Sequence, residues 1–162
     1  MVYTLSDLEN WLKDPESETL EFKEAKHKFE FDRLLKYCCA LANEGGGKMI
    51  LGVTDQRPRT IVGSQAFPEP GQTVAQLSEK LRLRIRSEEI AHPQGRVLVF
   101  EVPSHPIGVP IHADGTYYAR SGDSLVPLQP TELRRIFDEA VPDYSAELLP
   151  SAKLSGELNR RR

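Results

Sequence analysis

Three carboxylates in the first third of the chain, Glu16, Glu21 and Asp55, have a spacing suited to chemistry on a phosphate backbone. Glu16 and Glu21 belong to the run 16–23, and Asp55 closes the run 42–55. If these two runs form neighbouring strands, the three acids converge. Carboxylate oxygens are the ligands that Mg²⁺ and Mn²⁺ prefer, and these ions leave sites for water and phosphate. The sequence therefore predicts an Mg²⁺ or Mn²⁺ site at these acids.

The same residues have a structural interpretation. Glu21 could form an ion pair with Lys23, and Asp55 could be a turn residue after a strand. Glu16 would then be an exposed loop residue. Lys23 shares the strand face of Glu21, so it could neutralise phosphate charge as part of the catalytic set, or simply pair with that glutamate. Arg120 precedes a glycine turn, where it could grip a phosphate or pair with a nearby acid.

The elements that would position these residues are predicted by hydrophobic spacing. Residues 19–23 alternate as in a strand, which places Glu21 and Lys23 on the polar face. Residues 30–43 carry the apolar stripe of a helix that ends at the glycines 45–47. Residues 49–53 are apolar on both faces, which is typical of a central strand. Glu16 must then reach in from a loop, because an offset of five would place it on the other strand face.

The remaining segments complete a single α/β domain of the mixed α+β kind, with a central mixed sheet flanked by helices. The further elements that we expect are a helix with a capping box of Ser6 and Glu9, a strand over 60–63, a helix over 74–81, a hairpin of 83–86 with 96–102, a hairpin of 116–119 with 125–128, and a helix from Pro130 to about 140. A longer helix through Arg86 is the alternative to the first hairpin. We expect the domain to occupy residues 1–141, with a tail or linker over 142–162.

Charge and composition limit how the chain could bind a partner. A net charge of −3 and a pI near 5.8 argue against a general electrostatic grip on nucleic acid, so any binding must be local. Residues 80–96 hold five basic and two acidic side chains, and residues 22–48 hold six and four. Such mixed runs are also typical of solvated faces. The basic residues predicted to contact nucleic acid are Lys23, Lys26, Lys28, Lys48, Arg84, Arg86 and Arg120.

Cysteine and histidine usage excludes other classes. The two cysteines, Cys38 and Cys39, are adjacent on the predicted helix and cannot easily bond each other. The four histidines fit no familiar ligand spacing, so we expect no zinc. No run approaches the roughly 18 apolar residues that span a bilayer, and the amino terminus lacks the features of a secretory signal. We therefore expect a cytoplasmic protein without a membrane segment.

The order of these motifs resembles the Schlafen AlbA_2 domain. The run Glu-Ser-Glu-Thr-Leu-Glu-Phe-Lys (16–23) is followed by a helix, by Ala-Asn-Glu-Gly-Gly-Gly-Lys (42–48), by an apolar strand and by Gly-Val-Thr-Asp (52–55). The segments 60–63 and 97–102 look like later strands of the family. Residues 117–124, Tyr-Tyr-Ala-Arg-Ser-Gly-Asp-Ser, look like its tyrosine, arginine and glycine hairpin. The likeness covers about residues 5–140.

This resemblance implies a domain that handles nucleic acid. In animal Schlafen proteins the domain is an endoribonuclease for structured RNA such as transfer RNA, and its three acids match Glu16, Glu21 and Asp55. A metal-dependent endoribonuclease is thus the first hypothesis, with RNA favoured over DNA. In many bacterial relatives the domain is described as a DNA-binding module, often in transcriptional regulators, so a non-catalytic DNA- or RNA-binding module is the alternative.

Older descriptions of the family as an ATP-binding domain supply a third, weaker hypothesis. The loop Gly45-Gly46-Gly47-Lys48 does not match the phosphate-loop pattern, since its glycines end a helix and begin a strand. The helix dipole would present its negative end to a phosphate there.

The chain also has one copy of the domain where the animal nucleases have two lobes, and it lacks their zinc site. A homodimer could restore a two-walled groove.

Overall fold

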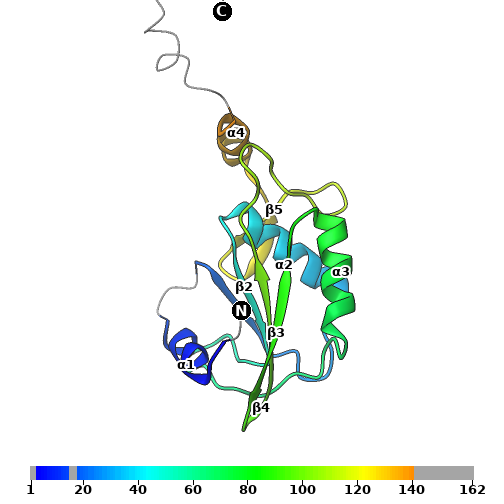
Figure 1. Ribbon diagram of the computed structural model, residues 1–162. Helices are drawn as coiled ribbons and strands as arrows, with labels where there is room; N and C mark the ends of the chain where they lie inside the picture. Colours follow the sequence, from blue (N-terminus) through cyan, green and yellow to red (C-terminus); the bar gives the residue numbers. More distant parts are fainter. Residues whose placement is uncertain (1–2, 15–17, 141–162) are drawn as a thin grey trace, which may run out of the picture.

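The computed structural model describes residues 3–14 and 18–140, which contain four helices and six strands (Figure 1). In chain order these are α1 (Leu5–Lys13), β1 (Leu20–Lys23), α2 (Phe31–Asn43), β2 (Gly47–Leu51), α3 (Pro70–Leu81), β3 (Arg86–His92), β4 (Gly95–Val102), β5 (Tyr118–Ser121), β6 (Ser124–Pro127) and α4 (Pro130–Asp138). The predicted tail, 142–162, lies outside the described residues. No described helix is both long and apolar enough to cross a membrane.

The central sheet has four strands in the order β1-β2-β4-β3. β1 and β2 are parallel, with Glu21 opposite Met49, whereas β4 runs antiparallel to both β2 and β3. The mixed sheet and the α/β class are confirmed. The two acid-bearing segments are neighbours as predicted, because β1 pairs directly with β2.

Helices cover both faces of this sheet (Figure 1). On the α2 and α3 side the core includes Met49 and Phe100, and on the α1 side it includes Phe22 and Ile50. Since neighbouring residues of β2 point to opposite faces and both are fully buried, β2 is the central strand that its apolar run predicts. Each of these large side chains contributes roughly 1.5–3 kcal/mol through its burial.

Two sequence predictions are corrected at the amino-terminal side of the fold. The capping box of α1 is formed by Thr4 and Asp7, whose backbone and side chains bond reciprocally at 3.1 and 2.8 Å, and not by Ser6 and Glu9. Residues 60–63 form only a single bridge, Ile61 with Val53, instead of a strand. Positive φ values at Gly52 and Gly63 take the backbone out of the extended conformation on either side of that bridge.

The predicted hairpin is present as β3 and β4, and the alternative of a longer helix through Arg86 is wrong. Its first strand, β3, begins later than predicted. α3 ends at Leu81, because the following residue, Arg82, has a left-handed conformation that stops the helix. Leu83 and Ile85 are buried and alternate with exposed arginines, but the ladder with β4 starts only at Arg86, opposite Glu101.

A second, two-stranded sheet of β5 and β6 packs on α2. Its turn is Gly122 and Asp123, close to the prediction, and the hairpin leads into α4 at Pro130. This placement brings the carboxyl-terminal hairpin of the domain next to β1, which is an edge strand of the main sheet.

Candidate functional site

Glu21 and Asp55 line one cavity of about 630 Å³, here called the acid cavity. Glu21 comes from β1, and Asp55 follows β2 after a turn of the backbone at Gly52. The full lining is Glu18, Leu20, Glu21, Glu44, Asp55, Arg59, Arg120, Gly122 and Asp123. The parallel pairing of β1 and β2 therefore brings these two acids together, as predicted.

Glu21 is a buried carboxylate with a cation at each oxygen. Its side chain is 3 % exposed, Oε1 accepts from Arg120 Nη1 at 3.0 Å, and Oε2 lies 3.4 Å from Lys23 Nζ. Burial raises the pKa of Glu21, and the hydrogen bond from Arg120 and the charge of Lys23 offset that rise only in part. The ion pair between Glu21 and Lys23 that the structural interpretation expected is present.

Arg120 ties the hairpin of β5 and β6 to the edge of β1. Its backbone N–H and its Nε both donate to the Glu44 carboxylate, at 2.6 and 2.9 Å. Its Nη1 and Nη2 donate to the carbonyl oxygens of Leu20 at 3.0 Å and Glu18 at 2.6 Å. Because the guanidinium of Arg120 already donates hydrogen bonds to these groups and to Glu21, it fixes the position of Glu21 and is poorly placed to bind a phosphate through two parallel hydrogen bonds.

Asp55 lies beside a second aspartate, Asp123. Burial raises the pKa of Asp55; the positive charge of Lys23 lowers it in part, and the Asp123 carboxyl raises it again. The Tyr37 hydroxyl donates to the Asp123 carbonyl oxygen at 2.7 Å and so holds the hairpin turn near Asp55. The Lys23 ammonium is 4.9 Å from the centre of the Tyr37 ring.

Asp123 and Glu44 are residues of this cavity that sequence reasoning missed. Asp123 is the aspartate of the predicted Ser-Gly-Asp-Ser turn, and Glu44 follows Asn43 at the end of α2. Glu44 lies in the run 42–48 and Asp123 in the run 117–124, but their spacing from Glu21 and Asp55 does not predict a shared site. Only the packing of the hairpin on α2 brings them to the cavity.

The donor chemistry of the cavity suits a hard divalent cation at Asp55 better than at Glu21. Asp55 and Asp123 present neighbouring carboxyl groups where additional positive charge is favoured, whereas both oxygens of Glu21 are already bonded to cations. Within residues 3–14 and 18–140, no three His, Cys, Asp or Glu side chains gather closely enough to hold a metal ion. Glu16 lies outside the described residues, so the predicted triad stays a prediction.

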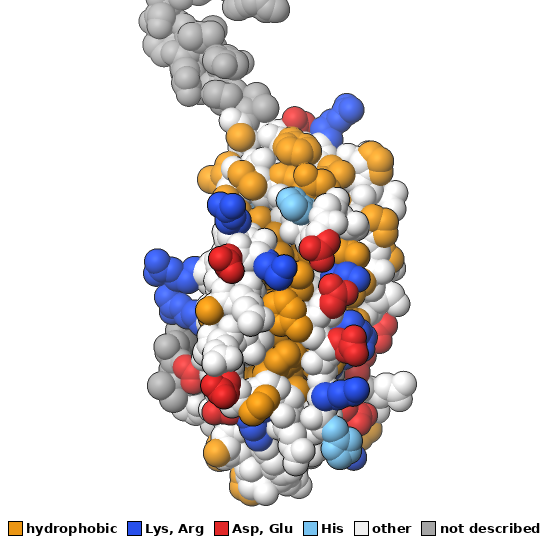
Figure 2. Space-filling view, turned by 90° about the vertical axis from the view of Figure 1, so that its right-hand side faces the viewer, with side chains coloured by type: hydrophobic (Ala, Val, Ile, Leu, Met, Phe, Trp, Pro, Cys, Tyr) orange, Lys and Arg blue, Asp and Glu red, His pale blue; other side chains and the backbone are white. Residues whose placement is uncertain are grey.

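The basic residues predicted to bind nucleic acid are distributed over several places. Lys48, Arg84 and Arg86 come together in a second cavity, Lys26 lines a third with Arg96, and Lys28 is exposed. Figure 2 shows lysine and arginine side chains interleaved with aspartate and glutamate over one face of the molecule. That face is not uniformly basic, as the net charge predicts.

The segment from Asn43 to Gly47 has a structural role. The buried Asn43 side chain accepts from the Ile111 N–H at 2.7 Å and donates to the carbonyl oxygens of Ile111 and Tyr118. The Gly46 N–H donates to Leu41 O at 2.8 Å, which closes α2. The glycines thus end a helix and begin β2, as predicted, and the negative end of the α2 dipole faces this turn.

Comparison with known families matches residues 16–129 to the family described as Schlafen, AlbA_2. The chain belongs to the Schlafen AlbA_2 family. Its matched range includes Glu16, Glu21, Asp55 and Arg120. Membership of the Schlafen AlbA_2 family indicates a domain related to nucleic acid.

Two solved structures are similar to this chain at low sequence identity. The DIP2311 protein from Corynebacterium diphtheriae is 21% identical, with a TM-score of 0.64 over 84% of this chain; the match covers 32% of that protein, so the present chain spans about a third of its length. The N-terminal domain of a RecG-related protein from Nitrosomonas europaea is 20% identical, with a TM-score of 0.49 over 80% of this chain and 94% of that domain. Among curated proteins none matches the chain.

Proposed function

We propose that the domain cleaves the phosphodiester backbone of RNA at the acid cavity, with the help of a divalent metal ion. One observation carries the proposal: Glu21 and Asp55, from two separate segments, line the same cavity, and the Lys23 ammonium is close to both. The resemblance to animal Schlafen endoribonucleases, which place three acids at the matching positions, supports RNA as the substrate.

The protein groups in and beside the cavity have distinct roles in this proposal. Burial raises the pKa of Asp55, and a bound cation would stabilise its charged form. Lys23 supplies positive charge beside the position of the phosphate, and Arg120 fixes the orientation of Glu21. Asp55, with Asp123 beside it, would be the main ligand of the ion, and Glu21 and Glu16 are the other acids of the predicted triad. When bound, the ion supplies Lewis-acid polarisation of a phosphoryl oxygen and lowers the pKa of a water molecule.

The test is cleavage of 5′-labelled transfer RNA and of single-stranded DNA by the purified protein in Mn²⁺, Mg²⁺ or EDTA. We expect RNA products with either metal ion and none in EDTA. Asp55→Asn keeps the size of the side chain and removes its charge, and we expect it to slow cleavage roughly hundredfold or more. Cleavage at the wild-type rate by Asp55→Asn would contradict the proposal.

Asp114→Asn is the matched control for this experiment. Asp114 is an exposed turn residue with φ of 52°, a conformation that asparagine tolerates, and it does not line the acid cavity. We therefore expect Asp114→Asn to cleave at the wild-type rate. Equal losses in both variants would point to a general effect of removing charge.

A non-catalytic nucleic-acid-binding module is the second candidate function. The observation that favours it is the ion-paired state of Glu21, whose two oxygens already serve the fold through Arg120 and Lys23. This candidate predicts binding of RNA or DNA that weakens steeply with salt, and no product that depends on a divalent ion. The same set of reactions therefore separates the two functions.

A further inference from the structure

A second cavity, also of about 630 Å³, opens beside the acid cavity and is here called the basic groove. Its charged lining residues are Lys48, Arg84, Arg86 and Glu101, and its remaining lining is Thr19, Gly45, Gly46, Gly47, Val102, Pro103 and Ser104. Three cations against one carboxylate leave an excess of two positive charges, which exceeds the roughly half negative charge that the α2 dipole places at the glycine turn. The chain as a whole carries −3, so this excess is local.

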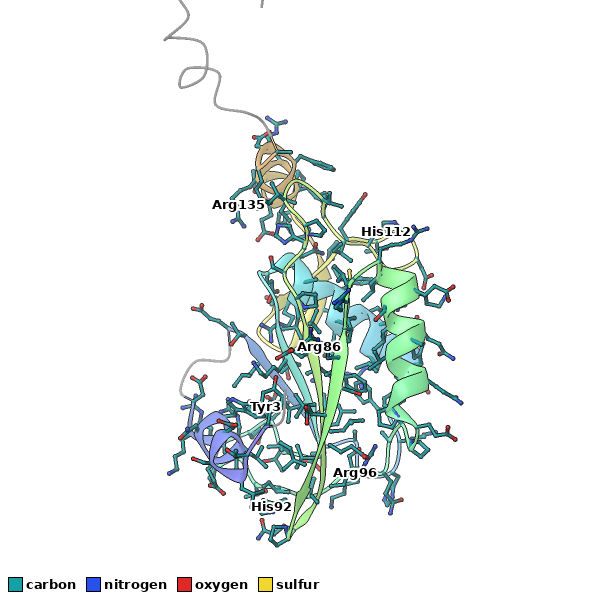
Figure 3. All side chains as sticks on the ribbon, viewed as in Figure 1. Tyr3, Arg86, His92, Arg96, His112 and Arg135 are labelled. Carbon is teal, nitrogen blue, oxygen red and sulfur yellow. The ribbon has the colours of Figure 1, made fainter. Side chains whose placement is uncertain are left out.

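The strand register explains why these charges meet. Lys48 on β2 and Arg86 on β3 both lie opposite Glu101 of the intervening β4, so the three residues form a row across the sheet. Glu101 also accepts a hydrogen bond from the Tyr3 hydroxyl. Figure 3 labels Tyr3 and Arg86, which lie in the same part of the molecule. One carboxylate shared among these neighbours leaves most of the positive charge of the groove uncompensated.

The cations of the basic groove differ in their partners from the two cations that contact Glu21. Lys23 and Arg120 form ion pairs with Glu21 and Glu44. Among the described residues, no carboxylate forms an ion pair with Lys48, Arg84 or Arg86, and both arginines are exposed. Charges of this kind are available to the phosphates of a ligand.

The two cavities meet along the start of β1 and the end of α2. Thr19 and Gly45 line the basic groove, and their chain neighbours Leu20 and Glu44 line the acid cavity. We infer that the basic groove binds the sugar-phosphate backbone of the nucleic-acid strand whose adjoining phosphodiester enters the acid cavity. This inference rests on the proposed function for its ligand, and it assigns binding to Lys48, Arg84 and Arg86.

Trp11 provides a direct readout of this binding. It is the one tryptophan of the chain, and its ring centroid is 5.7 Å from Lys48 Nζ. The experiment titrates the full chain with a 12-nucleotide single-stranded RNA, and with DNA of the same sequence, in EDTA at several salt concentrations. We expect tryptophan emission to change on binding, with an affinity that falls as salt rises. The two arms show whether RNA or DNA supplies the bound backbone.

Variants of the groove give the decisive comparison. We expect Arg84→Gln and Arg86→Gln each to weaken binding roughly tenfold and to lower the salt slope by about one unit. Arg82→Gln is the matched control, because Arg82 is an exposed arginine of the same segment that does not line the groove. Far-ultraviolet circular dichroism of each variant checks that the fold is kept.

The outcomes separate this inference from the proposed function. If Arg84→Gln and Arg86→Gln bind with the wild-type affinity, the inference that the basic groove binds nucleic acid is wrong, even if Asp55→Asn abolishes cleavage. Weak binding by the groove variants with no metal-dependent product would support the groove and leave the nuclease proposal refuted. Failure of the wild-type chain to bind either strand would overturn the groove, and the transfer-RNA cleavage assay decides the nuclease proposal separately.

Discussion

Arg120 Nη1 donates to Glu21 Oε1 at 3.0 Å, although the two residues lie 99 positions apart in the chain. Both side chains are nearly inaccessible, at 6 % and 3 % exposed. The pair joins the β5–β6 hairpin to the edge strand β1, so one contact closes the fold and also orients a carboxylate of the acid cavity.

Arg120→Gln is expected to lower the free energy of unfolding by about 3 kcal/mol, because it leaves the buried Glu21 without one of its two cations and removes the ion pair with Glu44. Urea unfolding measures this change. Arg134→Gln, at an exposed position of α4, is the control and should shift stability by less than about 0.5 kcal/mol. A loss as small as that of the control would show that the pair does not stabilise the fold.

Asp55→Asn is expected to raise the melting temperature at pH 7 by roughly 2 °C. The raised pKa of Asp55 means that the folded state holds the proton more tightly than the unfolded state does. Ionisation therefore costs stability as the pH rises above the ordinary pKa of aspartate, and asparagine avoids that cost. The gain should be fully present above the raised pKa and absent below the ordinary value. Melting curves from pH 3 to pH 8 check this, and a gain confined to acidic pH would contradict the sign.

Asn43→Asp is expected to cost about 3 kcal/mol, because a carboxylate cannot donate to the carbonyl oxygens of Ile111 and Tyr118. Asn10→Asp makes the same change at an exposed position of α1 and should have little effect. The test compares the denaturant concentrations at which the two variants are half unfolded. Similar midpoints would show that the hydrogen bonds of the buried Asn43 side chain do not stabilise the fold.

Gly47→Ala is expected to destabilise the domain by about 2 kcal/mol or more, since a Cβ there would lie 2.4 Å from Thr19 O. β1 and β2 would have to separate to admit it. Gly71→Ala, in the first turn of α3 with nothing within 4 Å, should instead stabilise by about 0.5 kcal/mol. Thermal melts of both variants test this contrast, and a tolerated Gly47→Ala would show that the strands can shift.

Local patterns predicted much of this fold. The alternation around Glu21, the apolar run of β2 and the stripe of α2 are each set by residues within a few positions, so their periodicity is readable. The strand over 60–63 failed because Gly52 and Gly63 turn the backbone, which a hydrophobic pattern does not encode. The start of β3 was misplaced because Leu83 and Ile85 alternate before their ladder begins.

The site was predictable only where the contact follows from strand pairing. Glu21 and Asp55 come together because β1 and β2 pair, and Glu21 with Lys23 because they share a face. Asp123 and Glu44 arrive through the packing of a distant hairpin on α2, and nothing in their local sequence announces it. The assignment of Arg120 required its full set of partners, which only tertiary structure supplies.

The most direct test of the account is a crystal structure of the chain soaked in Mn²⁺, with an anomalous difference map calculated at the manganese edge. The account predicts an anomalous peak in the acid cavity at Asp55, present in the wild-type chain and lost in Asp55→Asn. The account would be contradicted if the wild-type map had no peak in that cavity while protein from the same crystals, once dissolved, cleaved RNA in Mn²⁺.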